Sequence, residues 1–143
     1  MTSQDRALAI ADNVAYVDAA VDESVERATA EAPPLLVYAG FSQGVAMAFR
    51  AALQGRRQAA GIIAVGGDVP PEIRENPAVR FPRTLLARGT GDDWYTMAKL
   101  EADVAAIEPH GGHVQTLVFD GGHEWTMAVS TAAGRFLADL LAP

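Results

Sequence analysis

The sequence predicts an α/β fold in which a parallel sheet of about four strands is flanked by helices. Short apolar runs alternate with longer segments in which apolar residues recur every three or four positions. The run from Gly61 to Val65 is apolar throughout, as expected for a parallel strand covered on both faces. Each apolar run leads into a polar, glycine-rich loop. In parallel sheets these loops gather at the carboxyl ends of the strands, where binding sites form.

The first element is a long amphipathic helix, which we expect from about Ser3 to Glu31. This segment contains no glycine or proline, and its apolar residues recur on one face: Ile10, Val14, Val17, Val21, Val25 and Ala28. Pro33 and Pro34 end it. We expect the helix to pack on the protein's own sheet rather than to bind a partner.

The stretch from Leu35 to Phe49 predicts a strand, a sharp turn and a helix. Apolar residues 35–39 lead into G-F-S-Q-G at positions 40–44, and a second apolar run follows. This is the context of a G-x-S-x-G nucleophile elbow, in which a strained turn raises a serine above the sheet edge. Ser42 is therefore the candidate nucleophile, and the backbone N–H of Gln43 is a candidate oxyanion donor. We expect both flanking glycines to be needed, because a Cβ at either position would collide with the neighbouring strand or helix.

The remaining elements continue the alternation of strands and helices. After a helix at 43–53 and the strand at 61–65, a proline-rich loop at 69–82 contains one short helical turn near 72–75. A strand at 84–87, a helix at 95–107, a turn at 108–113, a strand at 115–119 and a helix at 125–141 complete the chain. We expect a single domain over residues 1–143.

The composition excludes several classes of function. The chain has no cysteine, so it has no disulfide, no thiolate metal site and no thiol nucleophile. Any acyl-enzyme must therefore form on an oxygen. A net charge of −7 argues against a nucleic-acid surface, which would need clustered basic residues. No apolar run reaches the roughly 18 residues of a membrane span, and residues 1–5 do not begin a signal peptide, so we expect a cytoplasmic protein.

Three side chains suited to nucleophilic catalysis each follow a different strand. A histidine can take the proton of a serine hydroxyl, and a carboxylate can hold the imidazole in the required tautomer. His123, beside two glycines, is the candidate base, and Asp92 is the candidate acid. The chain order Ser42, Asp92, His123 is that of α/β hydrolases. Asp93 is the alternative acid, ranked second because Asp92 lies closer to the end of its strand.

Other polar and aromatic residues near these loops have simpler interpretations. Asp68 and Asp120 are expected to be turn or capping residues. His110 and His113 form an H-x-x-H pair, but it lies in a turn at the opposite sheet edge, so we expect no metal and no cofactor. Three aromatic residues are candidates for the wall of a substrate pocket, with the core as the alternative: Phe41, Trp94 and Trp125.

The motifs G-F-S-Q-G at 40–44, G-T-G-D-D-W at 89–94 and D-G-G-H-E-W at 120–125 resemble those of the phospholipase/carboxylesterase family of α/β hydrolases. This family includes relatives of acyl-protein thioesterases and of dienelactone-hydrolase-like esterases. The resemblance runs from the first helix onward. It implies Ser42 as nucleophile, Asp92 as acid and His123 as base, acting on carboxylic esters or thioesters of modest size, with short- to medium-chain acyl esters and lysophospholipids among them.

The chain departs from the family pattern at its front. Members of this family have further strands before the helix that precedes the nucleophile strand, and a loop among them donates a second oxyanion N–H. Here the sequence starts at that helix, so we expect a fragment of the usual fold in which residues 35–39 form an exposed edge strand. Two alternatives follow: an active ester hydrolase, or an impaired or inactive fragment that forms a homo-oligomer through this strand. Removal of one oxyanion donor lowers rates by about 10²–10³.

Overall fold

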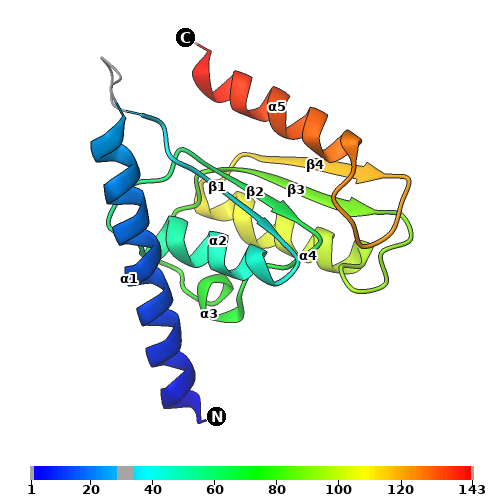
Figure 1. The fold of residues 1–143 in the computed structure, drawn as a ribbon. Coiled ribbons are helices and arrows are strands. Elements are labelled where there is room, and N and C mark those ends of the chain that lie inside the picture. Colours follow the sequence, from blue (N-terminus) through cyan, green and yellow to red (C-terminus); the bar gives the residue numbers. More distant parts are fainter. Residues whose placement is uncertain (1, 29–33, 143) are drawn as a thin grey trace.

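The computed structural model describes residues 2–28 and 34–142 as a four-stranded parallel sheet with helices on both faces (Figure 1). This confirms the predicted α/β fold class. In chain order the elements are α1 (Ser3–Arg27), β1 (Val37–Phe41), α2 (Gln43–Gln54), β2 (Gly61–Val65), α3 (Pro71–Arg74), β3 (Arg83–Gly89), α4 (Met97–Ile107), the 3₁₀ turn η1 (Glu108–His110), β4 (Val114–Phe119) and α5 (Met127–Leu141).

The strands lie in the order β1-β2-β3-β4, and every neighbouring pair is parallel. Sequential strands are therefore adjacent, and each connection crosses one face of the sheet. Val37 lies opposite Gly61, and Thr84 lies opposite Val114. Because all four strands run in the same direction, the loops that follow them meet along one edge.

The core consists of two apolar clusters, one on each face of the sheet. On one face, Ile62 and Ala64 of β2 pack with residues of α2, α3 and α4, whereas on the other face Ile63 and Val65 pack with α5. Successive side chains of a strand point to opposite faces, so a strand covered on both sides needs apolar residues at every position. All five residues of β2 are buried, which explains its unbroken apolar sequence.

Several boundaries differ from the sequence-based expectations. β1 begins and ends two residues later than expected, since the N–H of Ser42 still donates to the Val65 carbonyl at 2.9 Å. The expected end of α1 at Glu31 lies outside the described residues, and the described part of this helix ends at Arg27. At its other end, Thr2 and Asp5 form a capping box.

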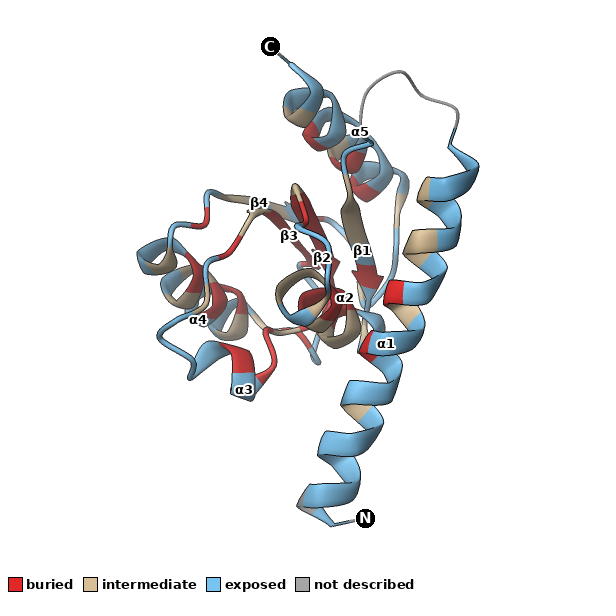
Figure 2. Ribbon diagram, turned by 90° about the vertical axis from the view of Figure 1, so that its left-hand side faces the viewer, coloured by how far each residue is buried: buried red, intermediate tan, exposed pale blue. Residues whose placement is uncertain are grey.

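The helix α1 packs on the domain mainly against α2, and residues 4–9 at its amino-terminal end are exposed (Figure 2). Val14 and Asp18 are its buried residues. The Asp18 carboxylate accepts a hydrogen bond from the backbone N–H of Arg56 at 3.0 Å, which fixes the helix to the loop after α2. Within the described residues, no helix has the length and apolar character needed to cross a membrane.

β1 is an edge strand, as the sequence predicts, because within the described chain it pairs with β2 alone. The carbonyl of Leu36 accepts from Ala60, and the N–H of Ser42 donates to Val65. Since successive residues of a strand direct their backbone groups to opposite sides, the N–H and C=O groups of Val37, Ala39 and Phe41 face the open side.

Candidate active site

Ser42 occupies the sharp turn between β1 and α2, with φ 53° and ψ −118°. It is the only residue other than glycine with a positive φ in the described chain. Two hydrogen bonds hold the backbone of Ser42 in this conformation. Its N–H donates to the Val65 carbonyl, and its own carbonyl accepts from the N–H of Val45 at 3.1 Å. A non-glycine residue in such a conformation is strained and persists only where the surroundings enforce it. This is the backbone geometry expected of the elbow.

Two glycines let the chain turn this tightly. A Cβ on Gly40 would lie 2.4 Å from the carbonyl oxygen of Gly44, so no side chain fits there. A Cβ on Gly67, after β2, would lie 2.6 Å from the Ser42 carbonyl oxygen. The expectation for the other flanking glycine is wrong: a Cβ on Gly44 would have no heavy atom within 4 Å. Of the two glycines in the motif, only Gly40 must lack a side chain, because the backbone of Gly44 lies too close to it.

His123 reaches Ser42 from the loop that follows β4. Its Nε2 atom lies 2.8 Å from the serine Oγ. The imidazole also lies against the ring of Phe41, with 5.0 Å between the ring centroids. The loop itself is anchored by a hydrogen bond from the Gly91 N–H to the Gly121 carbonyl at 2.8 Å. The histidine is therefore held by its own loop and by Phe41 of β1.

Asp92 holds the other ring nitrogen of His123, with 2.9 Å between Oδ2 and Nδ1. Its Oδ1 atom accepts hydrogen bonds from the backbone N–H groups of Trp94 and Tyr95, both at 2.9 Å. Burial raises the pKa of the Asp92 carboxyl, but the bonds from Tyr95, His123 and Trp94 together outweigh burial and leave this pKa below its usual value. An ionised Asp92 accepts only, so Nδ1 must donate and Nε2 is free to accept from the serine.

The structure brings Asp92 rather than Asp93 to the histidine. Asp92 is 3% exposed, whereas Asp93 is exposed and lines the pocket in front of Ser42. This pocket has a volume of about 640 Å³ and is lined by residues of all four loops: Ser42, Gln43, Ala46, Gly67, Asp68, Gly91, Asp93, Trp94 and His123. Asp68, expected to be a turn or capping residue, thus lines the pocket.

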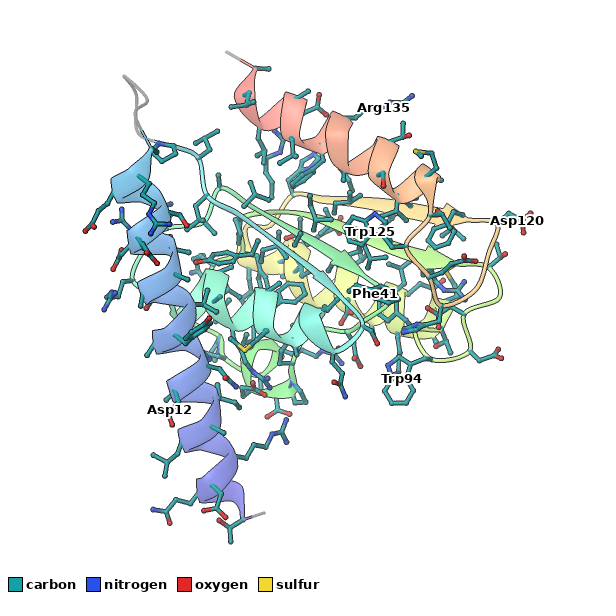
Figure 3. All side chains as sticks on the ribbon, viewed as in Figure 1. Asp12, Phe41, Trp94, Asp120, Trp125 and Arg135 are labelled. Carbon is teal, nitrogen blue, oxygen red and sulfur yellow. The ribbon has the colours of Figure 1, made fainter. Side chains whose placement is uncertain are left out.

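The three aromatic candidates lie in different places (Figure 3). Trp94 lines the pocket and is 65% exposed, and the Lys99 ammonium lies 5.0 Å from its ring centroid. Phe41 touches the imidazole but is not part of the lining. Trp125 is also outside the lining, and its indole N–H donates to the Ser130 hydroxyl at 3.0 Å.

Gln43 is the first residue of α2, and it lines the pocket. The first N–H groups of a helix have no partner within the helix, and the helix dipole makes this end partly positive. The backbone N–H of Gln43 is therefore available to a developing negative charge beside Ser42.

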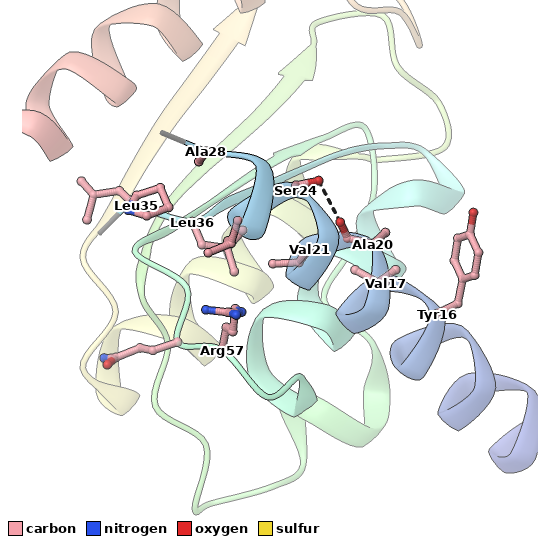
Figure 4. Close-up of a pocket in the computed structure, with 12 residues that line it drawn as sticks. Tyr16, Val17, Ala20, Val21, Ser24, Ala28, Leu35, Leu36 and Arg57 are labelled. Carbon is pink, nitrogen blue, oxygen red and sulfur yellow. Dashed lines mark hydrogen bonds between the residues drawn. The ribbon is translucent and has the colours of Figure 1, made fainter. Parts of the chain in front are cut away.

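A larger hollow of about 700 Å³ lies away from these residues, between the carboxyl-terminal half of α1 and the segment before β1 (Figure 4). Its walls are mostly apolar, and its one serine, Ser24, donates its hydroxyl to the Ala20 carbonyl at 2.8 Å. Its described lining residues include no histidine and no acidic side chain, whereas the smaller pocket contains both Ser42 and His123.

His110 and His113 lie before β4, at the opposite edge of the sheet from Ser42. The Nδ1 atom of His110 lies 2.9 Å from the Ala106 carbonyl oxygen, to which it donates. Among the residues that the structure describes, no three His, Asp or Glu side chains are grouped so that they could hold a metal ion.

Sequence reasoning missed the glycines at the ends of β2 and β3. A Cβ on Gly66 would lie 3.1 Å from the His123 ring, and one on Gly89 would lie 2.3 Å from the Gly122 carbonyl oxygen. It also missed Arg88, a buried arginine at the end of β3. A charged residue inside an apolar strand was the available signal.

Comparisons with known proteins agree with this architecture. The profile of the Phospholipase/Carboxylesterase family matches residues 1–92. Among solved structures, SOBER1 of Arabidopsis thaliana has a TM-score of 0.73 at 20% identity, with 93% of this chain and 65% of SOBER1 aligned. The Bacillus cereus carboxylesterase has a TM-score of 0.71 at 17% identity, over 92% of this chain and 61% of that one. Acyl-protein thioesterase 2 of Zea mays has a TM-score of 0.66 at 19% identity, over 90% and 65%.

The chain thus spans 61–65% of the length of these three proteins. No curated protein sequence matches it. The family profile nevertheless covers well over half of the chain, including the serine motif and the first aspartate of the pair after β3. The chain therefore belongs to the phospholipase/carboxylesterase family of α/β hydrolases.

Proposed function

We propose that this chain is a serine hydrolase that cleaves carboxylic esters or thioesters through a Ser42-His123-Asp92 triad and an acyl-enzyme. The observation that carries the proposal is the continuous hydrogen-bonded path from the serine Oγ through the imidazole to a buried carboxylate. Each of the three residues follows a different strand, and this arrangement matches the roles that the chemistry requires.

In the first half of the reaction, His123 Nε2 takes the proton of Ser42 Oγ as this oxygen attacks the carbonyl carbon of the ester. The carbonyl oxygen gains the negative charge, which the N–H of Gln43 stabilises at the start of α2. The imidazolium then gives its proton to the leaving alkoxide or thiolate, and the acyl group remains on Ser42.

In the second half, water replaces the alcohol or thiol. His123 takes a proton from this water as the water oxygen attacks the acyl carbon, and it returns the proton to Ser42 Oγ when the carboxylic acid leaves. The lowered pKa of Asp92 keeps this carboxylate charged beside the imidazolium at each stage.

The pocket favours substrates of modest size. Its volume of about 640 Å³ is in the range of pockets for small molecules. The exposed Trp94 provides an apolar wall for an acyl chain, and Phe41 and Trp125 are candidates to extend it. We therefore propose short- to medium-chain acyl esters, with thioesters and lysophospholipids as further members of the same substrate class.

The test compares hydrolysis of p-nitrophenyl butyrate by the wild type and by two serine variants. Ser42→Ala is expected to lower kcat by at least about 10³, because the nucleophile is lost. Ser24→Ala, which changes an exposed serine on α1, is the matched control and should leave kcat unchanged. Full activity in Ser42→Ala would refute the proposal.

The second candidate is an impaired or inactive hydrolase that associates through β1. It is favoured by the open edge, where Val37, Ala39 and Phe41 direct their backbone groups away from β2, since such an edge is a template for pairing with another strand. A second copy of this chain could pair antiparallel with β1 across a two-fold axis at Ala39, so that Val37 meets the partner's Phe41.

Light scattering on the purified chain separates the two candidates. The second candidate predicts a dimer with little or no ester hydrolysis that becomes monomeric in Ala39→Lys, because a charge on the edge opposes pairing. The control Ala105→Lys, on an exposed position of α4, should stay dimeric. An active monomer would contradict this candidate and support the first.

A further inference from the structure

Arg88 lies near the end of β3 with only 6% of its surface exposed. Charged side chains are rarely buried to this extent unless they are paired with an opposite charge. Among the described residues, Arg88 forms no salt bridge with an aspartate or glutamate. Its burial therefore needs another explanation.

The guanidinium donates to three backbone carbonyls. Its Nε atom bonds to the Tyr95 oxygen at 2.8 Å, and one Nη atom bonds to the oxygens of Asp92 at 3.1 Å and Thr90 at 3.4 Å. All three carbonyls belong to the loop between β3 and α4. This loop carries the carboxylate that bonds to His123.

The same loop is also held by the Asp92 carboxylate. Its Oδ1 atom accepts from the N–H groups of Trp94 and Tyr95, so Tyr95 bonds to Arg88 through its carbonyl and to Asp92 through its N–H. Arg88 thus fixes the backbone at Asp92 itself and at the residue that orients its Oδ1 atom. The remaining oxygen, Oδ2, is left for the imidazole.

We propose that Arg88 is a positioning residue: its guanidinium fixes the loop so that Asp92 holds His123 in place against Ser42. The inference rests on the proposed function, because positioning has a catalytic effect only if these three residues form a working triad. A planar guanidinium is suited to this task, since its donors diverge in a fixed geometry and reach the carbonyls of three residues in the loop. A lysine ammonium presents its donors from a single nitrogen and cannot span the same carbonyls.

The test uses Arg88→Lys and a control in the same strand, Arg83→Lys. Arg83 also donates to a backbone carbonyl, that of Asp139 at 3.1 Å, but on the far end of β3 from the triad. Arg88→Lys is expected to lower kcat on p-nitrophenyl butyrate by about 10²-fold with KM changed less than about threefold, because a small misplacement of a catalytic group has effects of this size. Arg83→Lys should keep the wild-type kcat.

Two readouts separate positioning from a merely structural role. The NMR signal of the His123 Nδ1 proton, which reports the bond to Asp92, should shift or broaden in Arg88→Lys and stay in place in Arg83→Lys. In an Asp92→Asn background, Arg88→Lys should have little further effect on kcat, because both changes act through the same carboxylate.

The outcomes also separate this inference from the proposed function. If the wild type is active and Arg88→Lys changes neither kcat nor the proton signal, the inference is overturned and the proposed function stands. If the wild type is inactive but the signal still depends on Arg88, the geometric part of the inference stands and the proposed function fails. Should Arg88→Lys not fold, Arg88→Gln, which keeps one donor, is measured instead. Unfolding of both would contradict a positioning role, since Arg88 would then be needed for the fold itself.

Discussion

The Nε2 atom of His123 lies 2.8 Å from the Oγ atom of Ser42, although the two residues are 81 positions apart in the sequence. Ser42 follows β1 and His123 follows β4, the two outer strands of the sheet. The loop after β4 therefore crosses the ends of β3 and β2 to reach the serine after β1. It passes over Gly89 at the end of β3 and Gly66 beyond β2, where any Cβ would press on the loop or on the imidazole. The absence of side chains at these strand ends allows the histidine to approach.

Gly89→Ala should therefore disturb the histidine loop. The added Cβ would lie 2.3 Å from the Gly122 carbonyl oxygen, so the loop must move. We expect kcat to fall by about 10²-fold, as for a misplaced catalytic base. Kinetics with p-nitrophenyl butyrate test this against Gly134→Ala, whose Cβ would meet nothing within 4 Å in α5. Equal kcat in the two variants would mean that the crossing does not position His123.

The two adjacent aspartates should differ sharply on mutation. Asp92→Asn removes the charge that holds Nδ1 and should lower kcat by about 10⁴ with a small change in KM. Asp93→Asn alters an exposed side chain of the pocket wall and should change kcat by less than about tenfold. A larger loss in Asp93→Asn would show that the acid had been assigned to the wrong residue.

The acid stability of the protein should depend on Asp92. Its pKa is lowered in the folded state, so it stabilises the fold above the unfolded value of about 3.9, and this contribution is lost as the pH falls through the lowered pKa. Urea unfolding at several pH values should give a stability gap between wild type and Asp92→Asn that is constant above about pH 5 and shrinks below it. The same gap at every pH would contradict a lowered pKa.

Asp103 should be needed for stability rather than for catalysis. It is fully buried, accepts from the Tyr95 hydroxyl at 2.8 Å and from the Val69 N–H at 3.2 Å, and pairs with Arg74. Burial raises the pKa of its carboxyl, with Tyr95 and Arg74 acting in the opposite direction.

Asp103→Leu leaves the Tyr95 hydroxyl and the Val69 N–H without an acceptor and removes the ion-pair partner of Arg74, so it should lower the free energy of unfolding by about 3–5 kcal/mol. Asp103→Asn keeps an acceptor in place and should lower it by about 1–2 kcal/mol. Denaturant unfolding measures both. Equal losses would mean that the charge of Asp103 matters more than its hydrogen bonds.

The sequence predicted the strands and the sharp turn at Ser42 well, because their signals are local. The apolar run 61–65 coincides with β2, and the serine lies at the turn that G-x-S-x-G predicts. Both depend on residues that are neighbours in the chain. The parallel arrangement then follows from the alternation of strands and helices.

Details that depend on the three-dimensional direction of a loop or helix could not be predicted in the same way. Whether Asp92 or Asp93 bonds to His123 depends on the conformation of the loop after β3. The guanidinium of Arg88 holds this loop through a hydrogen bond to the Asp92 carbonyl. A side chain fits at Gly44 but not at Gly40, and this difference depends on how closely β1 approaches the start of α2. The distance from the strand end ranked Asp92 first but left Asp93 open, and no spacing or periodicity distinguishes Gly44 from Gly40.

Covalent labelling by a fluorophosphonate is the decisive test of whether Ser42 is an activated nucleophile. Intact mass and peptide mapping should show one adduct per chain, on Ser42, with no adduct in Ser42→Ala and strongly slowed labelling in His123→Ala because the base is lost. Absence of an adduct on Ser42 in the folded wild type, or labelling that is equally fast without His123, would contradict the account.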